Sequence, residues 1–213
     1  MTREADFTAN PSHPPKRSSL MNLDKTELRR HLRRARAHMH PTERAAATQT
    51  INRLLKRHIK KGRHIGVYWP IGKELRLDDF IQTALKRGAK LYLPYIEPNS
   101  RRLWFTRYLS NKTQQPERKR GQAKLLIPQF AGEKRRVHRL DILLVPIVGI
   151  DKRGYRLGQA GGFYDASLAQ MKYRLHTQTL GVGFGCQLID ELPIEPHDIA
   201  LDGFVSERGE LKF

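Results

Sequence analysis

The pattern of apolar and polar residues divides the chain into alternating helices and strands. Apolar residues three and four apart predict helices over 24–39, 42–59 and 77–87, and helix-forming residues follow at 165–171. Short apolar runs predict strands at 64–69, 90–96, 103–108, 141–145 and 179–184, with a last one within 201–207. This alternation predicts an α/β layered domain with a mostly parallel sheet. The strand at 103–108 is expected near an edge, because charged and apolar residues alternate in it.

The first helix has the clearest local signals. Asp24 and, three residues later, Glu27 match a capping box, and Leu28 and Leu32 lie on one face. Gly62 and Gly88 are expected to end the second and third helices. The opposite face of the first helix carries Arg29, Arg30, Arg33, Arg34 and Arg36, and most of these, Arg29 excepted, are expected to lie in solvent.

Two polar segments are expected to lack regular structure. Residues 1–22 contain three prolines and predict a disordered leader, which leaves 23–213 as a single catalytic α/β domain. Residues 111–123 are polar and basic and predict a flexible loop, with the charged run 117–120 in solvent or clamping an acidic tail.

Composition limits the class of protein. No apolar run approaches the roughly 20 residues that span a bilayer, and the first residues lack the apolar core of a signal peptide. Cys186 is the only cysteine, so no internal disulfide forms, and we expect inert packing for it. These features predict a cytoplasmic protein that does not enter a membrane.

The net charge of +19 is unevenly distributed. Residues 23–140 hold 30 Lys and Arg against 9 Asp and Glu, whereas residues 141–213 hold 7 against 10. The basic part attracts anions, among them nucleotides, polyglutamate, nucleic acid and anionic lipid, without choosing among them.

The most informative stretch is 143–168, LLVPIVGIDKRGYRLGQAGGFYDASL. A strand leads into a loop with four glycines, and a helix follows, an order that can build an anion site from backbone amides. Lys152 and Arg156 add positive charge, and Asp165 is an oxygen ligand suited to magnesium. The spacing matches neither the Rossmann nor the Walker pattern, so by spacing alone a glycine-rich surface turn is an equal alternative.

The whole string VPIVGID-x-x-G-x-RLG-x-x-GGFYD resembles the signature of the 5-formyltetrahydrofolate cyclo-ligase family, also called 5,10-methenyltetrahydrofolate synthetases. Lys-Thr-Glu-Leu-Arg at 25–29 is similar to the family's KxxLR element, and the strand, loop and Glu74 at 64–74 match another. The Gln187, Pro193–Asp198 and Asp202 segments resemble the family's closing part, so the resemblance covers about 24–207. It implies a Rossmann-like three-layer sandwich, of the type shared with NagB, RpiA and CoA-transferase enzymes.

The resemblance also implies the reaction. The family closes the ring of 5-formyltetrahydrofolate to give 5,10-methenyltetrahydrofolate, and ATP becomes ADP and phosphate. The implied cofactors are ATP and Mg²⁺, and the substrate carries one glutamate or several. We expect a monomer.

The family's site residues carry over by position. Trp69, Glu74, Phe163 and Tyr164 would contact the folate, while Asp165 and Asp198 would hold Mg²⁺, with Asp202 a weaker candidate. The residues expected to bind ATP are Lys25, Arg29, Arg156, Leu157, Gly158, Gln159, Ala160, Gly161, Gly162, Phe163 and Tyr164.

Taken without the family, several of these residues have simpler interpretations. Glu74 could be a helix N-terminal carboxylate, Trp69 a core residue and Asp198 an Asx turn or cap. Ala160 departs from the family pattern, which usually has glycine there. A positive φ would strain an alanine at this position by about 1–2 kcal/mol, and close phosphate approach would meet its methyl group.

Two other functions remain as alternatives. A catalytically weak relative could bind nucleic acid through its basic part, although the aromatic residues do not interleave with the arginine runs. A different ATP-dependent ligase could use the same scaffold. The chain lacks HExxH, Cys/His clusters and GxSxG, so zinc chemistry and serine hydrolysis have no support.

Overall fold

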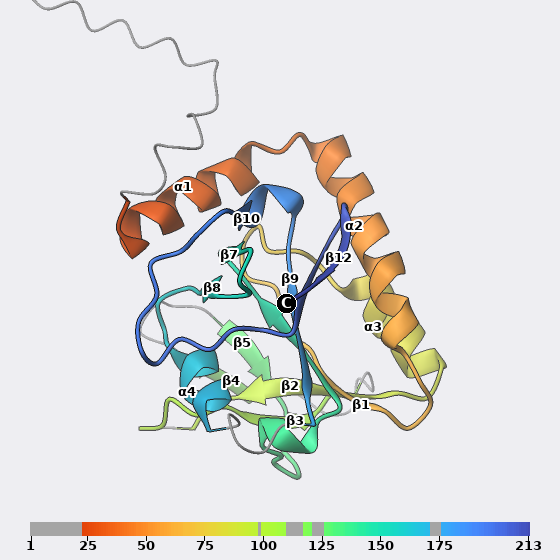
Figure 1. Cartoon of the computed structure of the whole chain (residues 1–213). Coiled ribbons are helices and arrows are strands. Elements are labelled where there is room, and N and C mark those ends of the chain that lie inside the picture. The colour runs from red at the N-terminus through yellow and green to blue at the C-terminus, as the bar shows by residue number, and fades with distance from the viewer. Residues whose placement is uncertain (1–22, 98, 110–116, 121–125, 171–175) are drawn as a thin grey trace, which may run out of the picture.

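The computed structural model describes residues 23–97, 99–109, 117–120, 126–170 and 176–213 (Figure 1). The helices are α1 (Lys25–His38), α2 (Pro41–Leu55), α3 (Asp78–Lys86) and α4 (Phe163–Ala169), with 3₁₀ turns η2 (Lys56–His58), η3 (Val137–Arg139) and η4 (Gly185–Gln187). The strands are β1 (His64–Gly66), β2 (Lys90–Tyr95), β3 (Trp104–Arg107), β4 (Glu117–Arg120), β5 (Leu126–Gln129), β6 (Ile142–Pro146), β7 (Gly149–Asp151), β8 (Arg156–Leu157), β9 (Gln178–Val182), β10 (Leu188–Ile189), β11 (Gly203–Ser206) and β12 (Gly209–Lys212).

A seven-stranded sheet organises the fold. Its order is β12-β11-β9-β6-β1-β2-β3, and the five inner strands run parallel while β3 and β12 are antiparallel edges. From β1 the chain builds outward through β2, and from β6 it builds in the opposite direction through β9. The carboxyl ends of β1 and β6 therefore meet at a topological switch point, where ligands bind in open α/β sheets.

Side chains that alternate along the inner strands fill two different cores. Ile142 and Leu144 of β6 face the layer that contains α2 and α3, whereas Leu143 and Val145 pack in the opposite layer with Leu168 of α4. All four β6 side chains are fully buried, which is typical of a strand covered on both faces. Figure 1 shows α2 and α3 side by side on one flank of the sheet. The predicted layered α/β fold with a mostly parallel sheet is confirmed.

Helix α1 packs on a small second sheet, β10-β7-β8, instead of on the main one. Leu28 and Leu32 of α1 are buried against Val148, Leu157 and Leu192. The predicted capping box is present, because Asp24 accepts from the Glu27 amide while the Glu27 side chain accepts from the Asp24 amide. This packing fixes the start of α1 beside the loop that joins β8 to α4.

Several predicted details are wrong. The strand expected at 64–69 ends at Gly66, and α4 begins two residues before Asp165. Residues 117–120 were expected in a loop but form β4, which pairs with β5, and β12 was not predicted. Arg36 is buried with 6% of its surface exposed, so it does not belong to the solvated arginine face. The leader predicted at 1–22 lies outside the described residues.

None of the helices among the described residues combines the length and the apolar character that crossing a membrane requires.

Candidate active site

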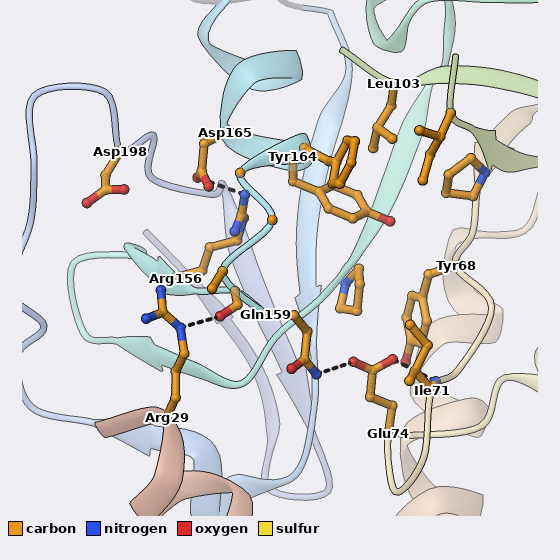
Figure 2. A pocket seen from close by; sticks show the side chains of 18 of the residues that line it. Arg29, Tyr68, Ile71, Glu74, Leu103, Arg156, Gln159, Tyr164, Asp165 and Asp198 are labelled. Atoms are coloured by element: carbon orange, nitrogen blue, oxygen red, sulfur yellow. Dashed lines mark hydrogen bonds and ion pairs between the residues drawn. The ribbon is translucent and has the colours of Figure 1, made fainter. Parts of the chain in front are cut away.

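A cavity of about 280 Å³ opens at the carboxyl ends of β1, β2 and β6, beside the loop between β8 and α4 (Figure 2). Every residue predicted for ATP, folate or magnesium lines it except two. One is Leu157, which is buried against α1. The other is Asp202, the weaker metal candidate, whose carboxylate accepts from Thr179 at 2.7 Å. The residues that resemble the family's site therefore come together in one place.

The loop that enters α4 forms one wall of the cavity. Gly162 is the N-cap residue of α4 and has φ 65°, a left-handed conformation that glycine adopts without strain. Ala160 also has a positive φ, 77°, and lines the cavity. The sequence-based concern about Ala160 thus applies, because an alanine occupies a position whose backbone favours glycine.

Cations from two elements converge on this loop. Arg29 of α1 donates through Nε to the Gly158 carbonyl at 2.9 Å, and Arg156 donates to Asp165 at 2.7 Å. Arg156 is 8% exposed, and its Nε has no hydrogen-bond partner among the described residues. The Nε is shielded from solvent, but Arg156 lines the cavity, and a guanidinium there is suited to binding an anion.

Lys25 lies at the same end of the cavity. Its Nζ is 2.8 Å from an Asp198 oxygen and 3.0 Å from a Glu195 oxygen. Although burial opposes its charge, the hydrogen bonds to Asp198 and Glu195 raise the pKa of Lys25. Burial likewise opposes the Asp198 charge, but the Lys25 hydrogen bond lowers the pKa of Asp198 below its ordinary value. Both groups are charged at neutral pH.

Asp165 and Asp198 face the cavity, each paired with a cation. Asp198 also accepts from the Glu195 amide at 2.8 Å, so the alternative of a local turn describes part of its role. Within the described residues no three His, Cys, Asp or Glu side chains gather into a preformed metal cluster. Two carboxylates fit a magnesium ion that arrives with phosphates and keeps several waters.

The opposite end of the cavity is more apolar. Glu74 is only 7% exposed; one oxygen accepts from the Ile71 amide at 2.9 Å and the other from Gln159 at 2.8 Å. Glu74 precedes α3, whose first-turn acids are Asp78 and Asp79, so it is not a helix N-terminal carboxylate.

Aromatic side chains border Glu74 on the cavity wall. Trp69 is 41% exposed and is therefore not a core residue. Burial and then the nearby Glu74 carboxylate raise the pKa of Tyr164, so its hydroxyl stays protonated and can donate.

Sequence reasoning missed several lining residues. Tyr68 precedes the predicted Trp69, and its hydroxyl donates to the Leu75 carbonyl at 2.9 Å. The segment around the predicted Asp198 contributes two further residues, Glu195 and His197. Two more lie inside segments already matched to the family, Ile71 in 64–74 and Pro146 in 143–168. No motif marks the others, which the sheet brings together from distant segments: Pro94, Ile96 and Leu103.

Comparison with known proteins identifies the family of this chain. The model of the 5-formyltetrahydrofolate cyclo-ligase family matches residues 21–207. The 5-formyltetrahydrofolate cyclo-ligase of Haemophilus influenzae is 29% identical over 85% of this chain and 97% of its own length. That of Escherichia coli K12 is 33% identical over 67% of this chain and 76% of its own length. The solved 5,10-methenyltetrahydrofolate synthetase of Aquifex aeolicus is similar with TM-score 0.69 and 26% identity, over 88% of this chain and 92% of its own. The chain belongs to the 5-formyltetrahydrofolate cyclo-ligase family.

Proposed function

We propose that the cavity between α1, the β8–α4 loop and the segment after β1 is the active site in which this chain performs its family's reaction. ATP-dependent ring closure converts 5-formyltetrahydrofolate to 5,10-methenyltetrahydrofolate. The observation that carries the proposal is the division of one cavity into a cationic end with Lys25, Arg29 and Arg156 and a more apolar end with a buried carboxylate, Glu74.

The chemistry explains why both ends are needed. The formyl oxygen is a weak nucleophile and a poor leaving group, so transfer of the γ-phosphoryl group to it activates the carbon. N10 then attacks that carbon and loses its proton, and the carbon–oxygen bond breaks as phosphate leaves. Phosphoryl transfer needs alignment and charge neutralisation more than a covalent nucleophile.

At the cationic end, Lys25, Arg29 and Arg156 hold the triphosphate together with amides of the 158–162 loop. Arg156 contributes a guanidinium that lines the cavity and pairs with Asp165 in this structure. Arg29 already touches the loop through the Gly158 carbonyl, so it is positioned where the phosphates bind. The three cations offset the charge that spreads over the transferring group.

Asp165 and Asp198 are the residues that would hold Mg²⁺. When bound, the ion neutralises phosphate oxygens and orients them for in-line transfer. Both carboxylates are paired with cations in this structure, Asp165 with Arg156 and Asp198 with Lys25. To hold the ion, the two carboxylates would have to give up these partners, and Arg156 and Lys25 would then be available to phosphate oxygens.

At the other end, Glu74 accepts hydrogen bonds from N–H groups of the pterin ring. Trp69, Phe163 and Tyr164 border the ring, and the protonated Tyr164 hydroxyl is a donor within the same cavity. Burial strengthens the Glu74 interaction, because few waters compete for a carboxylate that is 7% exposed.

The test is the appearance of methenyl absorbance when the protein, Mg-ATP and 5-formyltetrahydrofolate are mixed. Asp165→Ala should lower the rate at which this absorbance appears by a factor of about 10² or more, because one of two ion ligands is lost. Asp79→Ala is the matched control, since Asp79 is an exposed carboxylate of α3 that pairs with Lys56. A fully active Asp165→Ala protein would refute the metal assignment, and an inactive wild type would refute the proposed function.

A further inference from the structure

Gln159 makes two side-chain hydrogen bonds, one to Glu74 in the cavity and one to α1. Its amide Nε2 donates to Glu74 Oε1 at 2.8 Å, and this bond connects the β8–α4 loop to the segment after β1. Its Oε1 accepts from Arg33 of α1. Figure 2 shows the Gln159 side chain extended toward Glu74, on the side away from Arg156 and Asp165.

The bond places Gln159 in competition with a ligand. Glu74 is 7% exposed, and its other oxygen is already used by the Ile71 amide at 2.9 Å. A pterin ring offers its amino and ring N–H groups as donors. The Oε1 oxygen of Glu74 is the one that accepts the hydrogen bond from Gln159. The Gln159 amide therefore takes one of the acceptor positions of the oxygen that a pterin donor would approach and competes with that donor for it.

Phosphate bound at the cationic end of the cavity would also affect the hydrogen bonds of Gln159. Gln159 lies between Gly158, whose carbonyl accepts from Arg29 at 2.9 Å, and Ala160, which lines the cavity. Phosphate oxygens are strong acceptors, and bound in this loop they compete with Glu74 for the Gln159 donor. A displacement of Arg29 toward phosphate also releases the Gly158 carbonyl next to Gln159.

We propose that Gln159 is a positioning residue that couples the two substrates, by occupying Glu74 until a nucleotide draws its amide away. The proposal rests on the proposed function of the cavity. Nucleotide binding then frees the Glu74 oxygen and strengthens folate binding. By linkage, folate strengthens nucleotide binding by the same factor.

The experiment measures the dissociation constant of 5-formyltetrahydrofolate by calorimetry, with and without a non-hydrolysable ATP analogue and Mg²⁺. In the wild type the analogue should tighten folate binding about tenfold, equivalent to about 1.4 kcal/mol. Gln159→Leu keeps the side-chain volume but has no donor. It should bind folate alone about as tightly as the wild type does with the analogue, and the analogue should no longer improve binding.

A second variant and a control sharpen the result. Gln159→Asn keeps the amide but is one methylene too short to reach Glu74, so it should behave like Gln159→Leu. Arg30→Ala removes an exposed cation of the same helix as Arg33 and should keep the tenfold coupling. Each variant is first shown to melt like the wild type.

Two results would overturn the coupling. The first is that the ATP analogue still tightens folate binding tenfold in both Gln159 variants. The second is that the variants bind folate more weakly than the wild type without nucleotide, which would mean that Gln159 supports folate binding instead of opposing it. Failure of the proposed function is distinct, because it appears as absence of methenyl product from the wild type. A wild type that closes the ring while the Gln159 variants keep its coupling ratio refutes this inference alone.

Discussion

Ala160 has a backbone conformation that an alanine side chain disfavours. Its φ of 77° lies in the left-handed region, where a Cβ costs roughly 1–2 kcal/mol relative to the right-handed one. Gly162, two residues later, has a similar φ without that cost. The loop therefore carries local strain at the wall of the cavity that we assign to the nucleotide.

We expect Ala160→Gly to lower the Michaelis constant for ATP about two- to threefold, because the loop reaches its binding conformation with less strain and without a methyl group near the phosphates. The free energy of unfolding should rise by about 0.5 kcal/mol, since glycine's greater freedom in the unfolded chain offsets part of the relief. Steady-state kinetics and urea denaturation measure the two quantities.

The matched control is Ala46→Gly, on the exposed side of α2. There φ is helical, so glycine should destabilise the protein by about 1 kcal/mol and leave the ATP constant unchanged. An ATP constant that is unchanged or higher in Ala160→Gly would show that the loop gains nothing from glycine at this position.

At the scale of elements, local signals predicted two helices closely and placed β3 at a sheet edge, but they extended α2 past its end at Leu55 and missed two strands. The capping box at Asp24 and the stop at Gly88 are short-range patterns, and α1 and α3 begin and end within a residue of the expected positions. Strands β4 and β12 depend on partners elsewhere: β4 pairs with β5 and β12 with β11. Their polar, charged sequences do not distinguish an edge strand from a loop.

The candidate site divides in the same way. The residues carried by one continuous motif, from Arg156 to Asp165, were predictable, because chain neighbours stay together in any fold. Ile96 and Leu103 reach the cavity only through the pairing of β2 with β3, which no local pattern encodes. The burial of Arg36 does have a sequence signal, because Arg36 follows Leu32 by four residues and so lies on the buried face of α1.

The start of α1 depends on an ion pair with a distant segment. Lys25 contacts Asp198 at 2.8 Å, and the Asp198 side chain is 12% exposed, so the pair is partly protected from water. We expect Asp198→Asn to lower the free energy of unfolding by about 1 kcal/mol at neutral pH. Asp78→Asn, which alters an exposed pair with Arg76, should change it by less than about 0.5 kcal/mol.

The pH dependence of that difference follows from the pKa shifts. The pKa of Asp198 is lowered in the folded protein, so its contribution is complete above the ordinary Asp pKa of about 3.9 and is lost as the pH falls through the folded value. The pKa of Lys25 is raised, so the pair persists up to the ordinary Lys pKa of about 10.4. Urea denaturation should give a constant difference between wild type and Asp198→Asn from about pH 5 to 9, and a smaller one below about pH 4.

A difference that grows as the pH falls would contradict the assigned direction of the Asp198 pKa. The measurement reports stability alone, so it is independent of the proposed role of Asp198 as an ion ligand.

At the scale of the whole molecule, the uneven charge bears on how anions reach the cavity. The basic excess lies in residues 23–140, and α1 carries exposed arginines beside Lys25 and Arg29, among them Arg30 and Arg34. A field of one sign around a cavity raises the local concentration of an oppositely charged ligand. The charge thus favours entry of ATP at the end where the cations converge.

Reversing charge near that end should weaken ATP capture, whereas the same reversal at the other end of the sheet should not. We expect Arg30→Glu with Arg34→Glu to raise the Michaelis constant for ATP about threefold at about 0.05 M salt with turnover unchanged, and the effect to vanish near about 0.5 M, where screening is strong. Lys60→Glu with Lys61→Glu removes as much charge. These two lysines precede β1, at the amino ends of the strands, so their reversal should leave the constant unchanged.

If both pairs of substitutions act equally, total charge and not its placement governs ATP entry. If neither acts, the basic surface does not serve ATP, and titration with single-stranded RNA over the same salt range becomes the measurement that decides its role.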